Sequence, residues 1–139
     1  MTWVGLLVLG ALLGAAGAAL MHMAGVARQR GSWAVAMVAI ALFYVVFAFE
    51  RGDPSYIAVH ALIAAAFAGM AVLGARASPW WIVAALAGHG LFDAAAHLIV
   101  ADPSPDWWGP FCLGVDVALA AWLARLMRRG EIAPISSPA

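Results

Sequence analysis

The chain has 139 residues, of which 66% are hydrophobic and only 10% are charged, and its mean hydropathy is +0.97. A soluble domain is usually close to half apolar and a quarter charged, so this composition excludes an ordinary soluble domain and predicts an integral membrane protein. The formal net charge is zero and no basic tract occurs, which excludes nucleic acid as a partner.

Five apolar segments are each long enough to cross the hydrocarbon core of a bilayer, which takes about 20 helical residues. In chain order they cover residues 3–27, 32–50, 55–76, 79–101 and 107–129. The short breaks between them carry turn residues, among them Pro54, Pro79, Pro103 and Pro105. We therefore predict an all-α bundle of five transmembrane helices that forms a single domain over residues 1–130, followed by a flexible tail over residues 131–139.

The first segment lacks the positive start of a signal peptide and is longer than the apolar core of one, so it is predicted to be a retained span. It contains Gly10, Gly14 and Gly17, and small residues at such spacing let helix backbones approach closely in lipid. These glycines could form a dimer seam or pack within the same bundle. The second interpretation is favoured, because a chain rich in glycine and alanine produces such spacings by chance.

The placement of the arginines predicts the orientation of the bundle. Six of them follow the first, third and fifth segments, on the side that the positive-inside rule makes cytoplasmic: Arg28, Arg30, Arg76, Arg125, Arg128 and Arg129. The tryptophans fit the same arrangement, with Trp3, Trp107 and Trp108 at the outer boundary and Trp33, Trp80 and Trp81 at the inner one. We expect a multi-pass protein of the bacterial inner membrane, in contact with lipids, with its N-terminus outside and its C-terminus in the cytoplasm.

The fourth and fifth segments carry titratable residues inside apolar runs. His89, Asp93 and His97 are spaced i, i+4 and i+8 along one face of the fourth predicted helix, and Cys112 and Asp116 are spaced i and i+4 on the fifth. An aspartate near the centre of a membrane helix costs about 2.5–3.5 kcal/mol on insertion scales. Such groups are therefore expected to be neutralised, paired or bound to a metal.

Distances along the chain predict which of these groups lie at the same depth. Asp93 and Asp116 are equally far from one point inside the turn "ADPSPD", and His97 and Cys112 are equally far from the same point. His60 and His97 are equally far from the turn between the third and fourth segments. Since an antiparallel hairpin places such pairs at equal depth, we expect His60, His97 and Cys112 in one layer, with both aspartates one turn deeper in the outer half of the membrane.

Histidine together with carboxylate is a ligand set that zinc and non-haem iron prefer, so the predicted cofactor is a divalent metal, zinc or iron. His89 and His97 lie roughly 12 Å apart along the helix axis, so one ion cannot readily take both. Residues spaced i and i+4 can share an ion, which selects Asp93 with His97. His60 and Asp116 complete the expected set. His89 would then support a ligand through a hydrogen bond, or bind a second ion.

Interpretations without a metal stay open for this set: a metal-free polar or proton-relay network, or separate packing contacts. Cys112 is more readily a small core residue than a thiolate ligand. His22 is more readily a structural residue of the bundle than a ligand. Glu50 is expected to be solvated or paired with Arg51 at the outer boundary.

The stretch "GHGLFDAAAHLIVADPSPDWWGPFCLGVDVALAAW" resembles the C-terminal half of a group of small bacterial multi-pass membrane proteins of unknown function. Their shared pattern is H-x-x-[WF]-D-x-x-H-H, a proline-containing loop and then C-x-x-x-D, which corresponds here to His89, Phe92, Asp93, His97, Cys112 and Asp116. Ala96 stands where that group often has the first histidine of a pair. The resemblance does not indicate which activity the protein has. A weaker likeness to membrane metallohydrolases of the ceramidase type is an analogy only.

Three functions are compatible with these features. The favoured one is a membrane metalloprotein with a site open to the extracytoplasmic side, which extends to a metal-dependent hydrolase of a lipid-like substrate with an aspartate as general base. The second is a proton-coupled carrier or channel component, which would need a homo-oligomer because five helices without a visible inverted repeat are few for a transporter. The third is a non-catalytic accessory subunit of a larger membrane complex.

Overall fold

The computed structural model describes residues 1–134, and in this part of the chain it is entirely helical apart from its loops. The helices are α1 (Trp3–Met23), α2 (Arg30–Arg51), α3 (Pro54–Arg76), α4 (Trp80–Ile99) and α5 (Trp108–Arg128). The predicted all-α class is confirmed, and all five helices are long and apolar enough to cross a membrane, which is compatible with a multi-pass membrane protein. Four helices begin and end close to the predicted segments, whereas α1 ends at Met23 instead of residue 27.

Local chemistry explains where the helices begin and end. The Thr2 hydroxyl accepts a hydrogen bond from the backbone N–H of Gly5, which caps the start of α1. The early end of α1 coincides with Gly25, whose φ of 75° is favourable for glycine and strained for other residues. Gly52 ends α2 in the same left-handed conformation, and Asp53 then caps α3 directly before Pro54.

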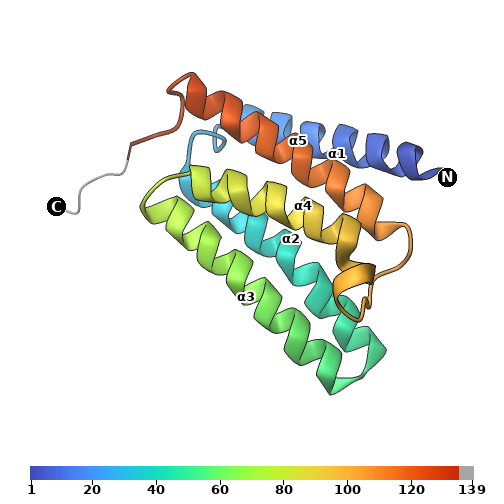
Figure 1. The fold of residues 1–139 in the computed structure, drawn as a ribbon. Helices are drawn as coiled ribbons and strands as arrows, with labels where there is room; N and C mark the ends of the chain where they lie inside the picture. The colour runs from blue at the N-terminus through green and yellow to red at the C-terminus, as the bar shows by residue number, and fades with distance from the viewer. Residues whose placement is uncertain (135–139) are drawn as a thin grey trace.

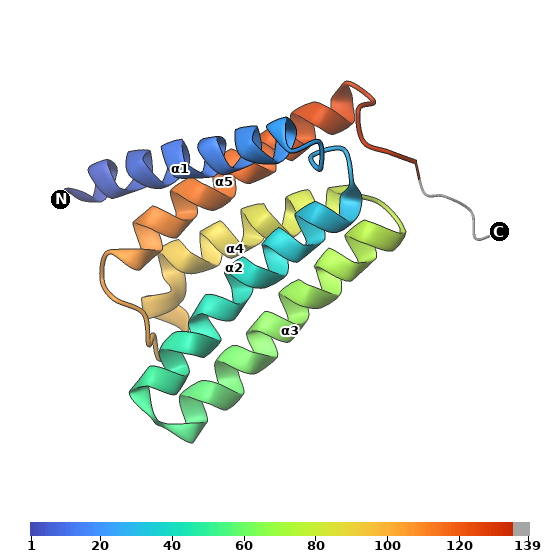
Figure 2. The same ribbon diagram turned by 180° about the vertical axis from the view of Figure 1, so that it is seen from behind.

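The helix α4 lies in the middle of the bundle (Figures 1 and 2). It packs against α5 on one side, and on the other it meets α3 and, over a smaller area, α2. The outer helices form two further pairs, α1 with α5 and α2 with α3. Figure 1 shows α1 and α5 running in the same direction, whereas α4 and α5 are joined by a loop and run antiparallel. The two faces of α5 therefore contact two different helices.

Glycines let α1 and α5 touch through their backbones. A Cβ on Gly10 would overlap the carbonyl oxygen of Phe111, and one on Gly14 would lie 2.6 Å from the carbonyl oxygen of Val115. Gly114 of α5 lies just as close to the carbonyl oxygen of Leu7. The interpretation that Gly10 and Gly14 pack within the bundle is therefore confirmed. A Cβ on Gly17 would meet nothing within 4 Å among the described residues.

One end of the bundle carries the end of α1, the start of α2, the end of α3 and the end of α5 (Figure 1), and with them six arginines: Arg28, Arg30, Arg76, Arg125, Arg128 and Arg129. At this arginine end, Arg30 donates to the carbonyl oxygens of Ala133 (3.0 Å) and Ala77 (3.3 Å). The backbone N–H of Ala133 donates to the carbonyl of Arg28 (2.9 Å). The first residues of the predicted flexible tail are thus anchored, and residues 135–139 lie outside the described part of the chain.

The predicted boundary tryptophans differ in how far their side chains are exposed. Trp3, Trp80, Trp81 and Trp107 are 46–53% exposed, as residues of an interfacial belt should be. Trp33 is fully buried and donates from Nε1 to the carbonyl oxygen of Ala27 (2.7 Å), and Trp108 is only 7% exposed. Trp33 and Trp108 still lie near the starts of α2 and α5, where the sequence placed them, but their side chains pack inward. Closeness to a loop fixes the height of a residue in the bundle but not the direction of its side chain.

Candidate metal centre

The site forms where α4 and α5 approach each other most closely. A Cβ on Gly90 of α4 would lie 3.1 Å from the Cβ of Asp116, and one on Gly109 of α5 would lie 2.6 Å from the carbonyl oxygen of Asp93. The absence of side chains at these two positions brings the polar faces of the two helices into direct contact.

His89 lies between two carboxylates. Its Nδ1 is 2.8 Å from Oδ2 of Asp116, to which it donates a hydrogen bond, and 3.1 Å from Oδ2 of Asp93. The Asp93 contact lies outside hydrogen-bonding geometry, so the Nδ1–H of His89 donates to Asp116 and not to Asp93. All three residues are at most 2% exposed. Gly90 lies beside Asp116 and Gly109 lies beside Asp93, so Asp93 is about one turn nearer the α4–α5 loop than Asp116 is. The predicted equal depth of the two aspartates is therefore wrong, although both side chains reach His89.

Cys112 completes a group of four. It precedes Asp116 by one turn of α5, and one ligand atom from each of His89, Asp93, Cys112 and Asp116 lies within 4.8 Å of all the others. We call these four residues the buried cluster. Within residues 1–134, three carboxylate oxygens of the cluster have no hydrogen-bond partner: both oxygens of Asp93 and Oδ1 of Asp116. Since a buried carboxylate oxygen without a partner is costly, the arrangement is suited to a cation.

Aromatic rings surround the histidine of the buried cluster. Phe67 of α3 meets the His89 ring edge to face at 4.9 Å, and Tyr44 of α2 meets it in the same way at 6.1 Å. Phe92 covers another side at 6.2 Å. These rings keep the local dielectric low, so charges in the cluster interact more strongly than they would in water. Helices α2 and α3 thus supply apolar walls, whereas α4 and α5 supply the polar groups.

His97 is outside the buried cluster, although the sequence places it one turn beyond Asp93. Its side chain is exposed and lines a cavity at the end of the bundle opposite the arginines. The reason is helical drift: at about 100° per residue, a position eight residues further on is turned by about 80°. When His89 and Asp93 face α5, His97 therefore faces outward.

His60 is fully buried but serves a different partner. Its Nε2 donates to the carbonyl oxygen of Ala101 (2.9 Å), in the loop that follows α4. Its ring stacks on Tyr44, with the centroids 5.3 Å apart and the planes 15° apart. Among the described residues, His60 Nδ1 has no hydrogen-bond partner. His60 therefore anchors the α4–α5 loop to α3, and the structure does not bring it into the buried cluster.

The four-residue group thus differs from the predicted ligand set. His89, expected beside the site, is at its centre, and Cys112, expected as a core residue, is one of the four. His22 and Glu50 are exposed and lie away from it. A sequence signal for the observed group did exist, because His89 with Asp116 and Asp93 with Cys112 are equally spaced about the same point in the α4–α5 loop.

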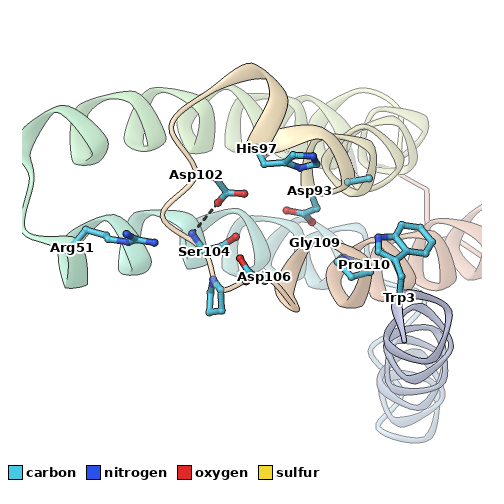
Figure 3. Close-up of a pocket in the computed structure, with 11 residues that line it drawn as sticks. Trp3, Arg51, Asp93, His97, Asp102, Ser104, Asp106, Gly109 and Pro110 are labelled. Atoms are coloured by element: carbon cyan, nitrogen blue, oxygen red, sulfur yellow. Dashed lines mark hydrogen bonds between the residues drawn. The ribbon is translucent and has the colours of Figure 1, made fainter. Parts of the chain in front are cut away.

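A cavity of about 430 Å³ lies next to the buried cluster, at the end of the bundle that carries the N-terminus and the α4–α5 loop (Figure 3). We call it the outer cavity, and its lining includes Trp3, Arg51, Asp93, His97, Asp102, Ser104, Asp106 and Gly109. Arg51 donates to the carbonyl oxygen of Pro103 (3.4 Å), and Asp102 accepts from the backbone N–H of Ser104 (2.8 Å). Asp93 belongs both to this lining and to the buried cluster.

Comparisons with known proteins identify no relative. No model of a known protein family matches the chain, and neither curated proteins nor solved structures give a significant match. The resemblance of residues 88–122 to a group of small membrane proteins therefore stays a prediction. What can be concluded about function depends on the geometry and chemistry of the site: this is a five-helix, membrane-type bundle with a buried His–Asp–Cys–Asp group that could hold a metal ion.

Proposed function

We propose that the protein is an integral membrane metalloprotein that binds one divalent transition-metal ion, preferentially zinc, at the buried cluster. One observation carries the proposal: four ligand atoms of the right chemical types lie within 4.8 Å of one another in the interior. Imidazole nitrogen, thiolate sulfur and carboxylate oxygen are the ligands that zinc takes. Iron is less favoured, because non-haem iron sites of the oxygenase type use two histidines with one carboxylate, and the cluster contains one histidine.

The chemistry of the cluster supports a bound cation. As ligands, Asp93, Asp116 and the Cys112 thiolate would together supply three negative charges in a site away from water. A divalent ion compensates most of that charge and gives the unpartnered oxygens of Asp93 and Asp116 a partner. Because ligands bind the ion in their deprotonated forms, loading would release protons.

The number of ligands favours holding or transferring the ion over hydrolysis. A tetrahedral zinc ion with four protein ligands has no open position, whereas catalytic sites keep one for water or substrate. Hydrolysis of a lipid-like substrate would require Asp93 to leave the ion and act as general base. Of the four residues, Asp93 is the one that also lines the outer cavity, so this extension is chemically coherent but second to metal binding.

We further propose that the arginine end faces the cytoplasm of a bacterial cell and that the outer cavity faces outward. The concentration of six arginines at one end supports this orientation under the positive-inside rule. The many exposed apolar side chains, such as Leu12, Leu62 and Leu98, support contact with lipid or with further copies of the chain.

Elemental analysis of the full chain, purified in detergent without chelator, tests the metal site. We expect about one zinc ion per chain for wild type, and less than about 0.2 for His89→Ala and Asp116→Ala. His97→Ala and His60→Ala are matched controls that should keep the ion. A wild-type protein with less than about 0.2 ion per chain would overturn the proposal. Metal loss in His97→Ala but not in His89→Ala would restore the ligand set predicted from sequence.

A metal-free proton relay is the second candidate, and one observation favours it. The hydrogen bond from His89 to Asp116 is complete without an ion, and Asp93 stands 3.1 Å from the same nitrogen while lining the outer cavity. A proton could thus be relayed inward in two steps: His89 gives its Nδ1 proton to Asp116, and Nδ1 then takes a proton that Asp93 has received from the cavity. Proteoliposomes loaded with a pH-sensitive dye test this, since Asp93→Asn should abolish proton flux. A flux that survives the substitution removes the relay.

A further inference from the structure

We infer that the outer cavity is the route by which a hydrated divalent cation reaches the buried cluster, and that Asp93 is the group that connects the two. This inference rests on the proposed function and deepens it, because it assigns the class of ion, the end of the bundle from which it comes and the residue that receives it first.

The position of Asp93 is the first argument. Its residue is only 2% exposed, yet its side chain lines the outer cavity together with His97, Asp102 and Asp106 (Figure 3). One of its oxygens is also 3.1 Å from His89 Nδ1, in the buried cluster. Neither oxygen has a hydrogen-bond partner in residues 1–134. A carboxylate in this position can take an ion from the cavity without leaving the cluster.

The size of the outer cavity is the second argument. At about 30 Å³ of liquid per water molecule, a volume of about 430 Å³ holds on the order of ten waters. That is enough for a cation with its first shell of water, so the ion can arrive hydrated. It would then exchange its waters for the ligands of the buried cluster one at a time, starting with Asp93.

The charge of the lining is the third argument, and it selects a cation. The lining contains three carboxylates, from Asp93, Asp102 and Asp106, and one guanidinium, from Arg51. The guanidinium donates to the carbonyl oxygen of Pro103, so it is held at the loop. A cleft with an excess of one charge concentrates the opposite charge and raises on-rates by about 10- to 1,000-fold.

Among the described residues, a cavity at the opposite end of the bundle does not reach the buried cluster. This cavity is lined by His22, Gly25, Ala27, Arg28 and Glu131, and it includes no residue of the buried cluster. Its lining holds one arginine, Arg28, and one glutamate, Glu131, so it has no excess of negative charge to attract a cation. The outer cavity, by contrast, contains a cluster residue in its wall.

Thiol labelling tests the route without any metal. In a Cys112→Ala background in lipid nanodiscs, Asp93→Cys should react with a positively charged methanethiosulfonate reagent. Adding Ala94→Phe, which fills the outer cavity, should slow this reaction at least about tenfold. Ala95→Phe, at a neighbouring position that does not line the cavity, is the matched control and should leave the rate within about twofold.

A second reporter keeps the labelling experiment decisive if Asp93→Cys does not fold. Ala94→Cys lines the same cavity and should react with the same reagent, and Ala95→Cys is its control. An Asp93→Cys reporter that reacts equally fast with and without the Ala94→Phe substitution overturns the route. So does a complete lack of reaction at both cavity positions.

Uptake of Co²⁺ tests the same route in the otherwise wild-type chain, through the absorption of the Cys112 thiolate–cobalt pair. Ala94→Phe should slow uptake at least about tenfold without changing the final stoichiometry. Asp102→Asn combined with Asp106→Asn should slow it about threefold to tenfold at low ionic strength, and less in high salt. Uptake by Ala94→Phe at the wild-type rate overturns the inference. If the wild-type chain takes up no Co²⁺, the proposed function fails, and the labelling result alone decides whether the route exists.

Discussion

Helix α5 packs closely against both α1 and α4 through glycines, but the two contacts bring different groups together. Against α1, Gly10, Gly14 and Gly114 let the backbones touch, and the neighbours of these three glycines are backbone atoms and the Cβ of Ala118. Against α4, Gly90 and Gly109 allow an equally close approach, and the space is used to bring histidine and carboxylates together. In lipid, where apolar burial does not drive helices together, close packing of small residues does. We therefore expect the α1–α5 contact to determine stability and the α4–α5 contact to determine metal binding.

The largest effect is expected when a ligand in the α4–α5 contact is removed. Asp116→Ala should lower zinc affinity by more than about a hundredfold, because it removes one of the four ligands. The α1–α5 contact should be unaffected. Competition with a zinc chelator measures the affinity, and Asp106→Ala in the outer cavity is the control that should keep it within about tenfold. A zinc affinity unchanged by Asp116→Ala would contradict the assignment of the site.

Removal of the metal should show how much zinc binding adds to the free energy of unfolding of the bundle. At a free zinc concentration of about 100 times Kd, binding should add about 2.7 kcal/mol to the free energy of unfolding. A chelator should therefore lower the Tm of wild type in detergent and leave that of Asp116→Ala unchanged. Equal sensitivity of both proteins to the chelator would mean that zinc binds elsewhere.

A glycine-to-alanine substitution in the α1–α5 contact should lower stability without affecting zinc binding. Gly10→Ala should cost about 1–3 kcal/mol of the free energy of unfolding, because its Cβ would overlap the carbonyl oxygen of Phe111. Zinc affinity should change little. Gly17→Ala is the control: its Cβ faces open space among the described residues, so stability should stay the same or rise slightly. Unfolding in denaturant compares the two variants, and equal stabilities would refute a close α1–α5 contact.

In the α4–α5 contact, Gly90→Ala should lower zinc affinity and should cost less stability than Gly10→Ala does in the α1–α5 contact. Its Cβ would lie 3.1 Å from the Cβ of Asp116, so the two helices need to separate by only a few tenths of an ångström. We expect zinc affinity to fall about tenfold, with a loss of stability of at most about 1 kcal/mol. A large loss of stability with unchanged affinity would reverse the roles of the two contacts.

The smallest effect should come from a residue outside both contacts. Asp53 caps α3, and hydrogen bonds from the Ser55 hydroxyl (2.7 Å) and backbone N–H (2.8 Å) lower the pKa of its carboxyl. Its stabilising effect is therefore present above the ordinary pKa of an aspartate and is lost as the pH falls through the lowered value. Asp53→Ala should lower Tm slightly at neutral pH and not at strongly acidic pH. A difference in Tm that persists at acidic pH would assign the effect to something other than this carboxylate.

Apolar length, turn residues and arginine placement were enough to predict five helices and one arginine-rich end, because a bilayer fixes how long a span must be. Counting along the chain was enough to bring Asp93 and Asp116 to the same part of the α4–α5 hairpin, but the equal depth that it gave them is wrong by about one turn. A short loop sets the depth of the residues on both sides of it only to within about a turn. Neither argument fixes rotation about a helix axis. Only the packing of α4 against α5 decided that His89 and Cys112 face inward with the two aspartates, while His97 turns to the outer cavity and His60 to a loop carbonyl. The reason is physical: depth follows from chain length, whereas direction follows from which neighbour a helix face contacts.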